Sequence, residues 1–328
     1  MNVLVCGGAG YIGSHAVAAL LDKGYGVIAL DNLEKGHKEA VWESAQLCVG
    51  DLRDKDFVNS VFKRCRVDAV MDFAAYSLVS ESMADPLKYY RNNVFGMINL
   101  LEAMNENGVK HIVFSSTASV YGIPKHIPLV ETEIPNPINP YGESKLAVEK
   151  MLKWADAVHG IKNAVLRYFN VGGAHPSGRI GEDHDPESHL IPRVLLSVIR
   201  KDNELELFGD DYDTPDGSCV RDYIHISDLV DAHILALERI RGEGISGTYN
   251  LGNGKGFSNK EIIKAAEQVT GERIDYKTMP RRPGDPAILV ASSDKAVTEL
   301  GWAPKHKDLN DIMSSAWEWH KNHPEGFK

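Results

Sequence analysis

The sequence has few cysteines, no long apolar run and no excess of positive charge. Its four cysteines, Cys6, Cys48, Cys65 and Cys219, are scattered and form no C-x-x-C pair. We therefore expect reduced thiols rather than disulfides or a zinc site. The apolar stretches are too short to span a bilayer, and the N-terminus lacks the basic region of a secretory signal. Together these absences lead us to expect a cytoplasmic protein.

The charge balance argues against nucleic acid or membrane as a partner. With 36 basic and 46 acidic residues, the formal net charge is −10, which disfavours binding to a phosphate backbone or to anionic lipid. A helix N-terminus or a local arginine can still hold an anionic small molecule. The length of 328 residues allows two domains or one large domain with an ample core.

The first half of the chain alternates short apolar runs with helical patterns, such as those at 14–24 and 92–108. This alternation predicts an α/β fold with a Rossmann-type, doubly wound parallel sheet that is covered on both faces. The expected strands lie at 2–6, 26–30, 45–49, 68–73, 111–115 and 163–169.

The second half lacks this regular alternation of strand and helix patterns. It has polar loops at 175–192, 208–218 and 280–287 and a capped helix that begins near Ser258. We therefore divide the chain into a first domain, residues 1–174, and a smaller α/β domain, residues 175–328. Residues 220–240 read as a strand and a helix, and we expect them to return to the first domain.

A glycine-rich loop follows the first expected strand. Gly7, Gly10 and Gly13 have G-x-x-G-x-x-G spacing and precede a helical pattern. Glycines allow the tight turn and close backbone approach that a pyrophosphate requires, and the next helix offers free N–H groups and a positive dipole end. Structural turns also use glycine, but the strand–turn–helix context favours dinucleotide binding.

Residues after the next strands fit the adenosine half of a dinucleotide. Asp31 follows the second strand, where a carboxylate accepts from the ribose hydroxyls and repels a 2′-phosphate, so NAD is favoured over NADP. Asp51, after the third strand, either reaches the adenine or caps the next helix. Ala74 and Ala75, after the fourth strand, let a ligand approach the backbone.

Tyr141 and Lys145 are the best candidates for proton chemistry. They lie one turn apart on a helix that is expected to begin at Pro140 with Asn139 as its cap. Tyrosine has a pKa of about 10 and is a poor base unless a nearby ammonium stabilises the phenolate. The pattern also occurs at "YGIPK" (121–125), but its proline breaks any helix there.

Hydroxyl side chains follow the fifth expected strand. Ser115, Ser116 and Thr117 lie at the carboxyl edge of the sheet, where parallel-sheet enzymes present ligands. Such a hydroxyl can hydrogen-bond a substrate oxygen as its proton leaves. The alternative is that any one of the three hydroxyls only forms hydrogen bonds within a turn of the backbone.

Taken together, these motifs resemble the extended short-chain dehydrogenase/reductase family. The residues that carry the resemblance are the glycine loop, Asp31, "SSTASVYG", "NPYGESK", "LRYFNVGGAHP", "VRDYIHISDL" and "RRPGD". They occur in order over nearly the whole chain. The later motifs are most similar to members that interconvert UDP-galactose and UDP-glucose.

The resemblance implies an NAD-dependent isomerase that inverts carbon 4 of a UDP-sugar. Tyr141 would remove the proton from the sugar 4-hydroxyl, Lys145 would lower the pKa of that tyrosine and hold the nicotinamide ribose, and Thr117 would hydrogen-bond the same oxygen. Hydride would pass to NAD, the 4-keto sugar would rotate, and hydride would return to its other face.

The resemblance also implies where the two ligands bind. The cofactor positions are Gly7, Gly10, Tyr11, Ile12, Gly13, Asp31, Asn32, Asp51, Leu52, Phe73, Ala74, Ala75, Asn92, Ser115, Lys145 and Phe169. The substrate positions are Thr117, Tyr141, Asn170, His189, Leu190, Glu206, Leu207, Phe208, Arg221, Arg282, Asp285 and Leu289. Among these, Phe208 would flank the uracil, and the arginines would hold diphosphate oxygens. A homodimer paired through helices near 88–107 and 140–158 is also implied.

Two positions depart from the family pattern. Ser77 stands where members often carry a lysine near NAD. Leu289 stands where some relatives have a bulky tyrosine that limits the sugar pocket. A leucine there leaves room for a 2-acetamido group, so UDP-N-acetylglucosamine and UDP-N-acetylgalactosamine are candidate second substrates.

Other functions fit these residues less well. A 4,6-dehydratase needs an acidic pair after the threonine, where this chain has Ala118 and Ser119. A non-catalytic NAD-binding regulator is expected to lack the tyrosine, the lysine or the hydroxyl. A reductase that releases NADH stays open, although the uridine-site residues disfavour it. His175, His184 and His189 share a loop with acidic residues, but their spacing fits no familiar ligand pattern, so we expect solvated histidines and no metal.

Overall fold

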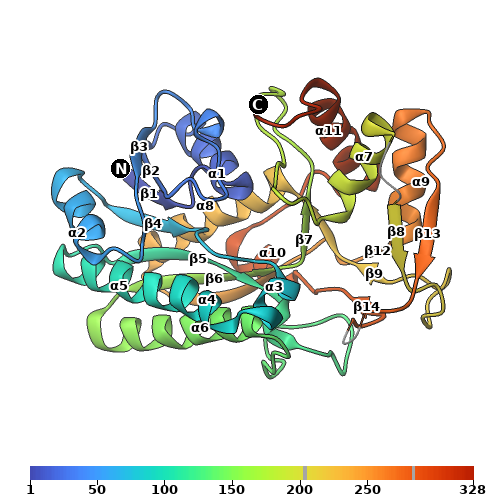
Figure 1. The fold of residues 1–328 in the computed structure, drawn as a ribbon. Coiled ribbons are helices and arrows are strands. Elements are labelled where there is room, and N and C mark those ends of the chain that lie inside the picture. The colour runs from blue at the N-terminus through green and yellow to red at the C-terminus, as the bar shows by residue number, and fades with distance from the viewer. Residues whose placement is uncertain (202–204, 283–284) are drawn as a thin grey trace.

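The computed structural model describes residues 1–201, 205–282 and 285–328. At its centre is a seven-stranded sheet in the order β11-β6-β5-β4-β1-β2-β3, with all neighbouring strands parallel (Figure 1). Its strands are β1 (Asn2–Cys6), β2 (Gly26–Asp31), β3 (Gln46–Val49), β4 (Ala69–Asp72), β5 (His111–Thr117), β6 (Lys162–Tyr168) and β11 (Gly247–Leu251). The predicted Rossmann-type, doubly wound fold class is confirmed.

Helices cover both faces of this sheet because side chains alternate along each strand. Val3 and Val5 of β1 pack in the layer of α1 (Tyr11–Asp22) and α8 (Ile226–Glu243), together with α10 (Asp294–Leu300). Leu4 and Cys6 pack in the opposite layer, with α2 (Lys55–Arg64), α5 (Gly96–Glu106) and α6 (Pro140–His159). Burial on both faces explains why the strands read as continuous apolar runs.

Short helical segments surround the carboxyl edge of the sheet. They are η1 (Lys38–Ala40), α3 (Val79–Ala84), α4 (Pro86–Tyr89), the π-helical segment η2 (Tyr90–Phe95) and η3 (Ala118–Tyr121). The sequence predicts one helix over 92–108. The structure divides that range between η2 and α5.

The second half of the chain builds a smaller unit beside the sheet (right in Figure 1). Its apolar core lies among α7 (Leu190–Arg200), α9 (Asn259–Thr270), α11 (Leu309–Asn322) and β8 (Leu205–Phe208). Small sheets pair β8 with β13 (Tyr276–Met279), β7 (Asn170–Gly172) with β10 (Tyr223–His225), and β9 (Val220–Arg221) with β12 (Phe257–Ser258) and β14 (Ile288–Leu289). Ser258 caps α9 in a capping box with Glu261.

Part of the second half completes the central sheet. α8 packs in the same core as α1 and β6, and it lies in the segment that was expected to return. β11 also joins the sheet beside β6, which the sequence does not indicate. The central sheet therefore draws on both halves of the chain.

The state of the cysteines and the character of the helices are as follows. Cys6, Cys48, Cys65 and Cys219 are free thiols. None of the helices in the described part of the chain has the length and apolar character needed to cross a bilayer.

Candidate active site

The glycine loop turns tightly against the start of α1. Gly7 has φ +72°, and a Cβ there would lie 2.8 Å from the backbone nitrogen of Ala74. A Cβ on Gly13 would lie 1.9 Å from the Gly7 carbonyl oxygen. Gly10 precedes α1, and no side chain there bonds the first N–H groups of the helix. Those groups, which begin at Tyr11 and Ile12, can therefore meet a pyrophosphate.

Asp31 ends β2 with both carboxylate oxygens fixed by the backbone. Oδ1 accepts from the Leu33 N–H at 2.8 Å, and Oδ2 accepts from the Ala9 N–H at 3.0 Å. Burial raises the pKa of Asp31, and the two hydrogen bonds act against that shift. A carboxylate held in one orientation at the end of the second strand suits the hydroxyls of an adenosine ribose.

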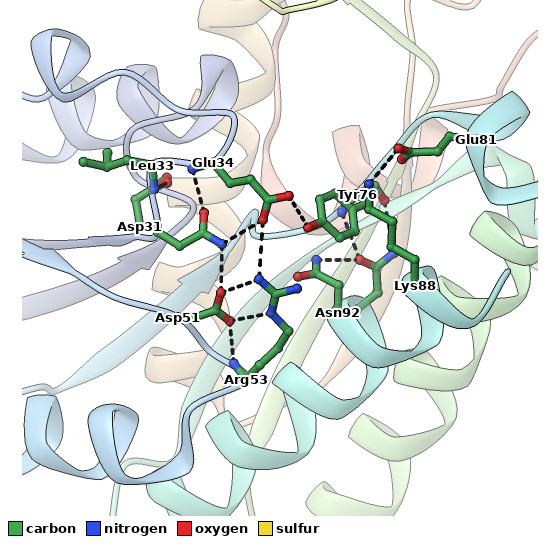
Figure 2. Close-up of polar contacts among 11 residues, drawn as sticks. Asp31, Leu33, Glu34, Asp51, Arg53, Tyr76, Glu81, Lys88 and Asn92 are labelled. Carbon is green, nitrogen blue, oxygen red and sulfur yellow. Dashed lines mark hydrogen bonds and ion pairs between the residues drawn. The ribbon is translucent and has the colours of Figure 1, made fainter. Parts of the chain in front are cut away.

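A polar network lies beside the end of β2 (Figure 2). Arg53 Nη2 donates to Asp51 at 2.5 Å, and Asn32 Nδ2 donates to the same oxygen at 2.9 Å. The hydrogen bond from Arg53 is the main reason that the pKa of Asp51 is about 2. The Tyr76 hydroxyl donates to Glu34 at 2.5 Å. Sequence reasoning missed Glu34, Arg53 and Tyr76, although Glu34 follows Asp31 closely in "LDNLEKG".

The interpretation of Asp51 as the cap of the next helix is wrong. Asp54, and not Asp51, caps α2 by accepting from the Phe57 N–H at 3.0 Å. The remaining cofactor positions lie on nearby elements: Leu52 packs in the core that contains α5, Phe73, Ala74 and Ala75 follow β4, and Asn92 belongs to η2.

Helix α6 begins as the sequence predicts. Asn139 Oδ1 accepts from the Gly142 N–H at 2.8 Å, and Pro140 is the first helical residue. Tyr141 and Lys145 follow on the first two turns. In the second Y-x-x-x-K match, Tyr121 ends η3 and is followed by a glycine with φ +67°, so that pair shares no helix.

Lys145 is a buried cation held at the end of β5. The residue is only 3% exposed, and its Nζ donates to the Ser115 carbonyl oxygen at 2.8 Å. Burial lowers the pKa of Lys145 to about 8, although the charges of Asp72 and Glu149 act in the opposite direction. This amine is therefore far easier to deprotonate than an exposed lysine, whose pKa is about 10.4.

Tyr141 meets Thr117 at the carboxyl edge of the sheet. Burial raises the pKa of Tyr141, and a hydrogen bond with the Thr117 side chain lowers it. The pKa of Tyr141 stays above its usual value, because the effect of burial is larger than that of Thr117. The lowering of this pKa by Lys145 stays a prediction. Thr117 ends β5, and its Oγ1 also accepts from the Ser119 N–H at 3.1 Å.

The two serines before Thr117 have other partners. Ser115 Oγ shares a short hydrogen bond with the Tyr168 hydroxyl, and Ser116 Oγ donates to Glu149 at 2.5 Å. Of the three hydroxyl residues in the cluster, Thr117 is the one whose side chain lowers the pKa of Tyr141.

Sequence reasoning also missed two carboxyl groups near Lys145. Asp72 ends β4 and is buried, and burial raises its pKa to about 6 although Lys145 lowers it. Glu149 lies one turn beyond Lys145 on α6. The signal for Glu149 was present, because it continues the four-residue spacing that begins at Tyr141.

Residues expected to bind the substrate meet around β9 and β14. Arg221 of β9 forms an ion pair with Asp285 at 2.5 Å. In the pairing of β9 with β14, Arg221 lies opposite Leu289. The Arg282 guanidinium lies 4.0 Å from the ring centroid of Phe208. Residues 283–284 of the "RRPGD" motif lie outside the described part of the chain.

Strand alternation separates the three candidates on β8. The Leu207 side chain is buried in the second core, whereas Glu206 and Phe208 are partly exposed on the other face. A ligand contact by Leu207 would therefore involve its backbone and not its side chain.

The other substrate candidates lie on neighbouring elements. Asn170 begins β7, and its N–H donates to the Asp222 carbonyl oxygen at 3.0 Å. His189 and Leu190 were expected in a loop, but Leu190 is the first residue of α7. Phe169 and Leu289 each pack against a small core that includes a leucine of α6.

The protein has a Rossmann-type sheet, a dinucleotide loop at the end of the first strand and a helix after β5 that carries a tyrosine and a lysine. These features define an NAD-dependent enzyme, and this protein is of that class. The sequence model of the NAD dependent epimerase/dehydratase family matches residues 3–252. The chain belongs to this family.

Similar proteins agree over the full length. A UDP-glucose 4-epimerase of Lactobacillus helveticus is 55% identical over 328 residues, which are 100% of this chain and 99% of that protein. A crystal structure of a UDP-glucose 4-epimerase is 51% identical, with a TM-score of 0.98 and complete coverage of both chains. The Bifidobacterium longum UDP-glucose 4-epimerase, solved with NAD+ and UDP, is 41% identical, with a TM-score of 0.95 and complete coverage of both chains.

Proposed function

We propose that this protein interconverts UDP-galactose and UDP-glucose by NAD-dependent inversion at carbon 4 of the sugar. The observation that carries the proposal is the placement of Tyr141 and Lys145 one turn apart at the start of α6, with Lys145 Nζ held by the Ser115 carbonyl oxygen near the end of β5. In the proposed reaction, Tyr141 is the acid–base group that meets the substrate hydroxyl. The full-length similarity to UDP-glucose 4-epimerases supports the choice of sugar.

The protein groups have separate tasks in this reaction. NAD, when bound, supplies the site that takes the hydride from carbon 4 and returns it. The Tyr141 oxygen takes the proton of the 4-hydroxyl and gives it back, while Thr117 hydrogen-bonds the same oxygen. Lys145, fixed by the Ser115 carbonyl, supplies positive charge beside the tyrosine when it is protonated.

The cofactor positions also support NAD as the resident dinucleotide. Asp31 carries a buried carboxylate where an NADP 2′-phosphate would lie. Arg53, the arginine labelled in the network of Figure 2, is paired with Asp51 at 2.5 Å. An ion pair of this kind leaves less of its charge for a phosphate group.

The proposal is tested by following UDP-galactose conversion to UDP-glucose without added reductant. We expect Tyr141→Phe to lower kcat by about 10²–10⁴-fold, because the acid–base group is lost, while KM changes little. Lys125→Met, in the second Y-x-x-x-K match, is the matched control and should keep full activity. Unchanged turnover in Tyr141→Phe would refute the mechanism, and stoichiometric NADH release would favour the reductase alternative.

We also propose that the sugar pocket accepts a 2-acetamido group. Leu289 lies on β14 beside Arg221, so the size of this side chain affects the space near the diphosphate anchor. We expect turnover of UDP-N-acetylglucosamine by the wild type and loss of that turnover in Leu289→Tyr, with UDP-galactose still converted. Equal failure of both proteins with the N-acetylated sugar would remove the proposal.

A homodimer is proposed through α4, η2, α5 and α6. Trp154 and Val158, one turn apart on α6, are 69% and 68% exposed, and Leu87 and Phe95 expose further apolar surface on α4 and η2. Such clustered apolar side chains are typical of an interface. The Trp154→Glu/Val158→Glu double variant should be monomeric by light scattering, whereas Ile134→Glu, at an exposed isoleucine in another segment, should not. A wild-type monomer would overturn the proposal.

A further inference from the structure

The segment before α7 gathers two histidines and two glutamates in one place. Glu182, His184, Glu187 and His189 each offer one ligand atom, and these four atoms lie within 4.8 Å of one another. We propose that this cluster binds a divalent transition-metal ion, with zinc as the best match. The proposal goes beyond the epimerase function and concerns a second kind of ligand.

Two of the three distances within the cluster are close to those between the ligands of a small ion, and the third is a direct hydrogen bond. His189 Nδ1 lies 2.5 Å and His184 Nδ1 lies 3.6 Å from the same oxygen of Glu182. His184 Nδ1 also lies 3.3 Å from Glu187 Oε2. Ligand atoms of a tetrahedral zinc site are about 3.3 Å apart, given metal–ligand distances of about 2.0–2.2 Å. Binding of an ion therefore requires that His189 and Glu182 exchange their direct hydrogen bond for bonds to the metal, whereas His184 already lies at a suitable distance from both glutamates.

The carboxylates are shielded and oriented for such a role. The side chains of Glu182 and Glu187 are only 3% and 11% exposed. Glu187 Oε1 accepts from the N–H groups of Ser188 and His189 at 2.7 and 2.8 Å, which leaves Oε2 facing His184. Hydrogen bonds that orient a ligating carboxylate in this way are a regular feature of metal sites.

The donor types select the ion. Two imidazole nitrogens and two carboxylate oxygens form a mixed set that zinc and similar transition ions accept in tetrahedral geometry. Magnesium and calcium prefer oxygen donors throughout. The four residues also occupy a short segment with the pattern E-x-H-x-x-E-x-H, so one ion would tie the whole segment together.

This segment touches the dinucleotide-binding side of the molecule. The His184 ring lies 6.3 Å from the ring of Tyr11, the first residue of α1. Lys35, which follows β2, donates to the Asp185 carbonyl oxygen at 2.5 Å, and His37 Nε2 lies 3.3 Å from the Asp183 carboxylate. An ion at the cluster would thus stiffen the segment that packs against the glycine loop and the loop after β2.

The experiment uses full-length, tag-free protein with its NAD retained, because an affinity tag of histidines binds zinc itself. After treatment with a chelator and gel filtration, the protein is titrated with zinc chloride, and bound metal is measured by mass spectrometry and calorimetry. We expect one zinc per chain, no displacement by excess magnesium, and visible absorption of a tetrahedral ion when cobalt replaces zinc.

Variants then locate the ion. His184→Ala and Glu187→Gln should each lose the bound zinc while retaining NAD and the circular dichroism spectrum of the wild type. His126→Ala changes an exposed histidine that pairs with Glu133, outside the cluster, and should retain zinc. Failure of the wild type to hold zinc, or equal zinc content in wild type and in both cluster variants, would overturn the proposal. Neither result depends on whether the epimerase function is correct.

Discussion

At the scale of single residues, the protonation of Lys145 depends on two carboxyl groups that flank it. Its pKa of about 8 reflects burial, which lowers it, and the charges of Asp72 and Glu149, which raise it. The ammonium form is present below this pKa and is lost as the pH rises through it. The unfolded chain holds this proton up to a pH of about 10.4, so between these values Lys145 makes stability rise with pH.

Asp72→Asn is therefore expected to change the pH dependence of the reaction. Removal of the Asp72 charge lowers the Lys145 pKa further, because the larger of the two raising contributions disappears. The alkaline limb of the kcat/KM profile should move to lower pH. Asp56→Asn, at an exposed position on α2, is the control and should leave the profile in place. An unchanged or upward-shifted limb in Asp72→Asn would contradict the assignment.

The buried ion pair of Arg167 and Glu149 allows a stability prediction. Their side chains are 7% and 8% exposed, and the charged atoms lie 2.5 Å apart. Arg167→Met leaves the Glu149 carboxylate buried without its partner, which should lower the free energy of unfolding by about 3 kcal/mol. Arg66→Met, in a pair whose arginine is 83% exposed, should cost less than about 1 kcal/mol. Urea unfolding measures both, and equal losses would contradict the prediction.

At the scale of elements, the start of α6 connects helix stability to the reaction. Asn139 accepts from the Gly142 N–H, and Tyr141 lies within the same first turn. Asn139→Ala should cost about 1 kcal/mol of stability and should also lower kcat, because a frayed first turn misplaces the tyrosine.

Asp308→Ala, which removes the side-chain cap of α11, is the matched control for this effect. It should cost a similar amount of stability in urea unfolding but leave kcat unchanged. A parallel fall of kcat in both variants would show that lost stability, and not the placement of Tyr141, explains the effect.

Local patterns predicted most elements of the first half. The strands β1 to β6 lie within about two residues of the expected runs because each is a largely apolar run, and all except the edge strand β3 are mostly buried. Asn139 and Pro140 mark the start of α6 for a similarly local reason. The Leu207 side chain lies in the core because β8 alternates between core and surface, and its place at the substrate stays a prediction.

Features that depend on the path of the chain were not predictable. β11 has a strand's length, but its place beside β6 depends on a long-range pairing. Asp51 and Asp54 are both plausible caps in sequence, and the turn geometry selects Asp54. Glu182 and His189 meet in a segment without regular secondary structure, so no hydrophobic period reveals their approach.

At the scale of the whole molecule, the dinucleotide-binding sheet cannot be separated from the second half. A fragment of residues 1–174 lacks both α8 and β11, which pack on α1 and pair with β6. We expect this fragment to unfold without cooperativity and to bind no NAD, since a large apolar face of the sheet is left uncovered.

Residues 1–252, the range that ends with the family match, form the comparison fragment. It contains all seven strands of the central sheet and α8, and it should bind NAD more tightly than the shorter fragment. Circular dichroism during urea titration measures the cooperativity of unfolding, and quenching of the protein's tryptophan fluorescence by NAD measures binding. Cooperative unfolding and NAD binding by residues 1–174 would contradict this view.

During synthesis on the ribosome, β6 is complete before its partner strand β11 has been translated. Residues 169–246 are translated between the end of β6 and the start of β11, so the nascent chain carries an unpaired strand edge for that whole interval. Such an edge can pair with a strand from another chain and lead to aggregation. We therefore expect that slowing translation across this interval lowers the soluble yield, and that chaperones which cover strand edges restore it.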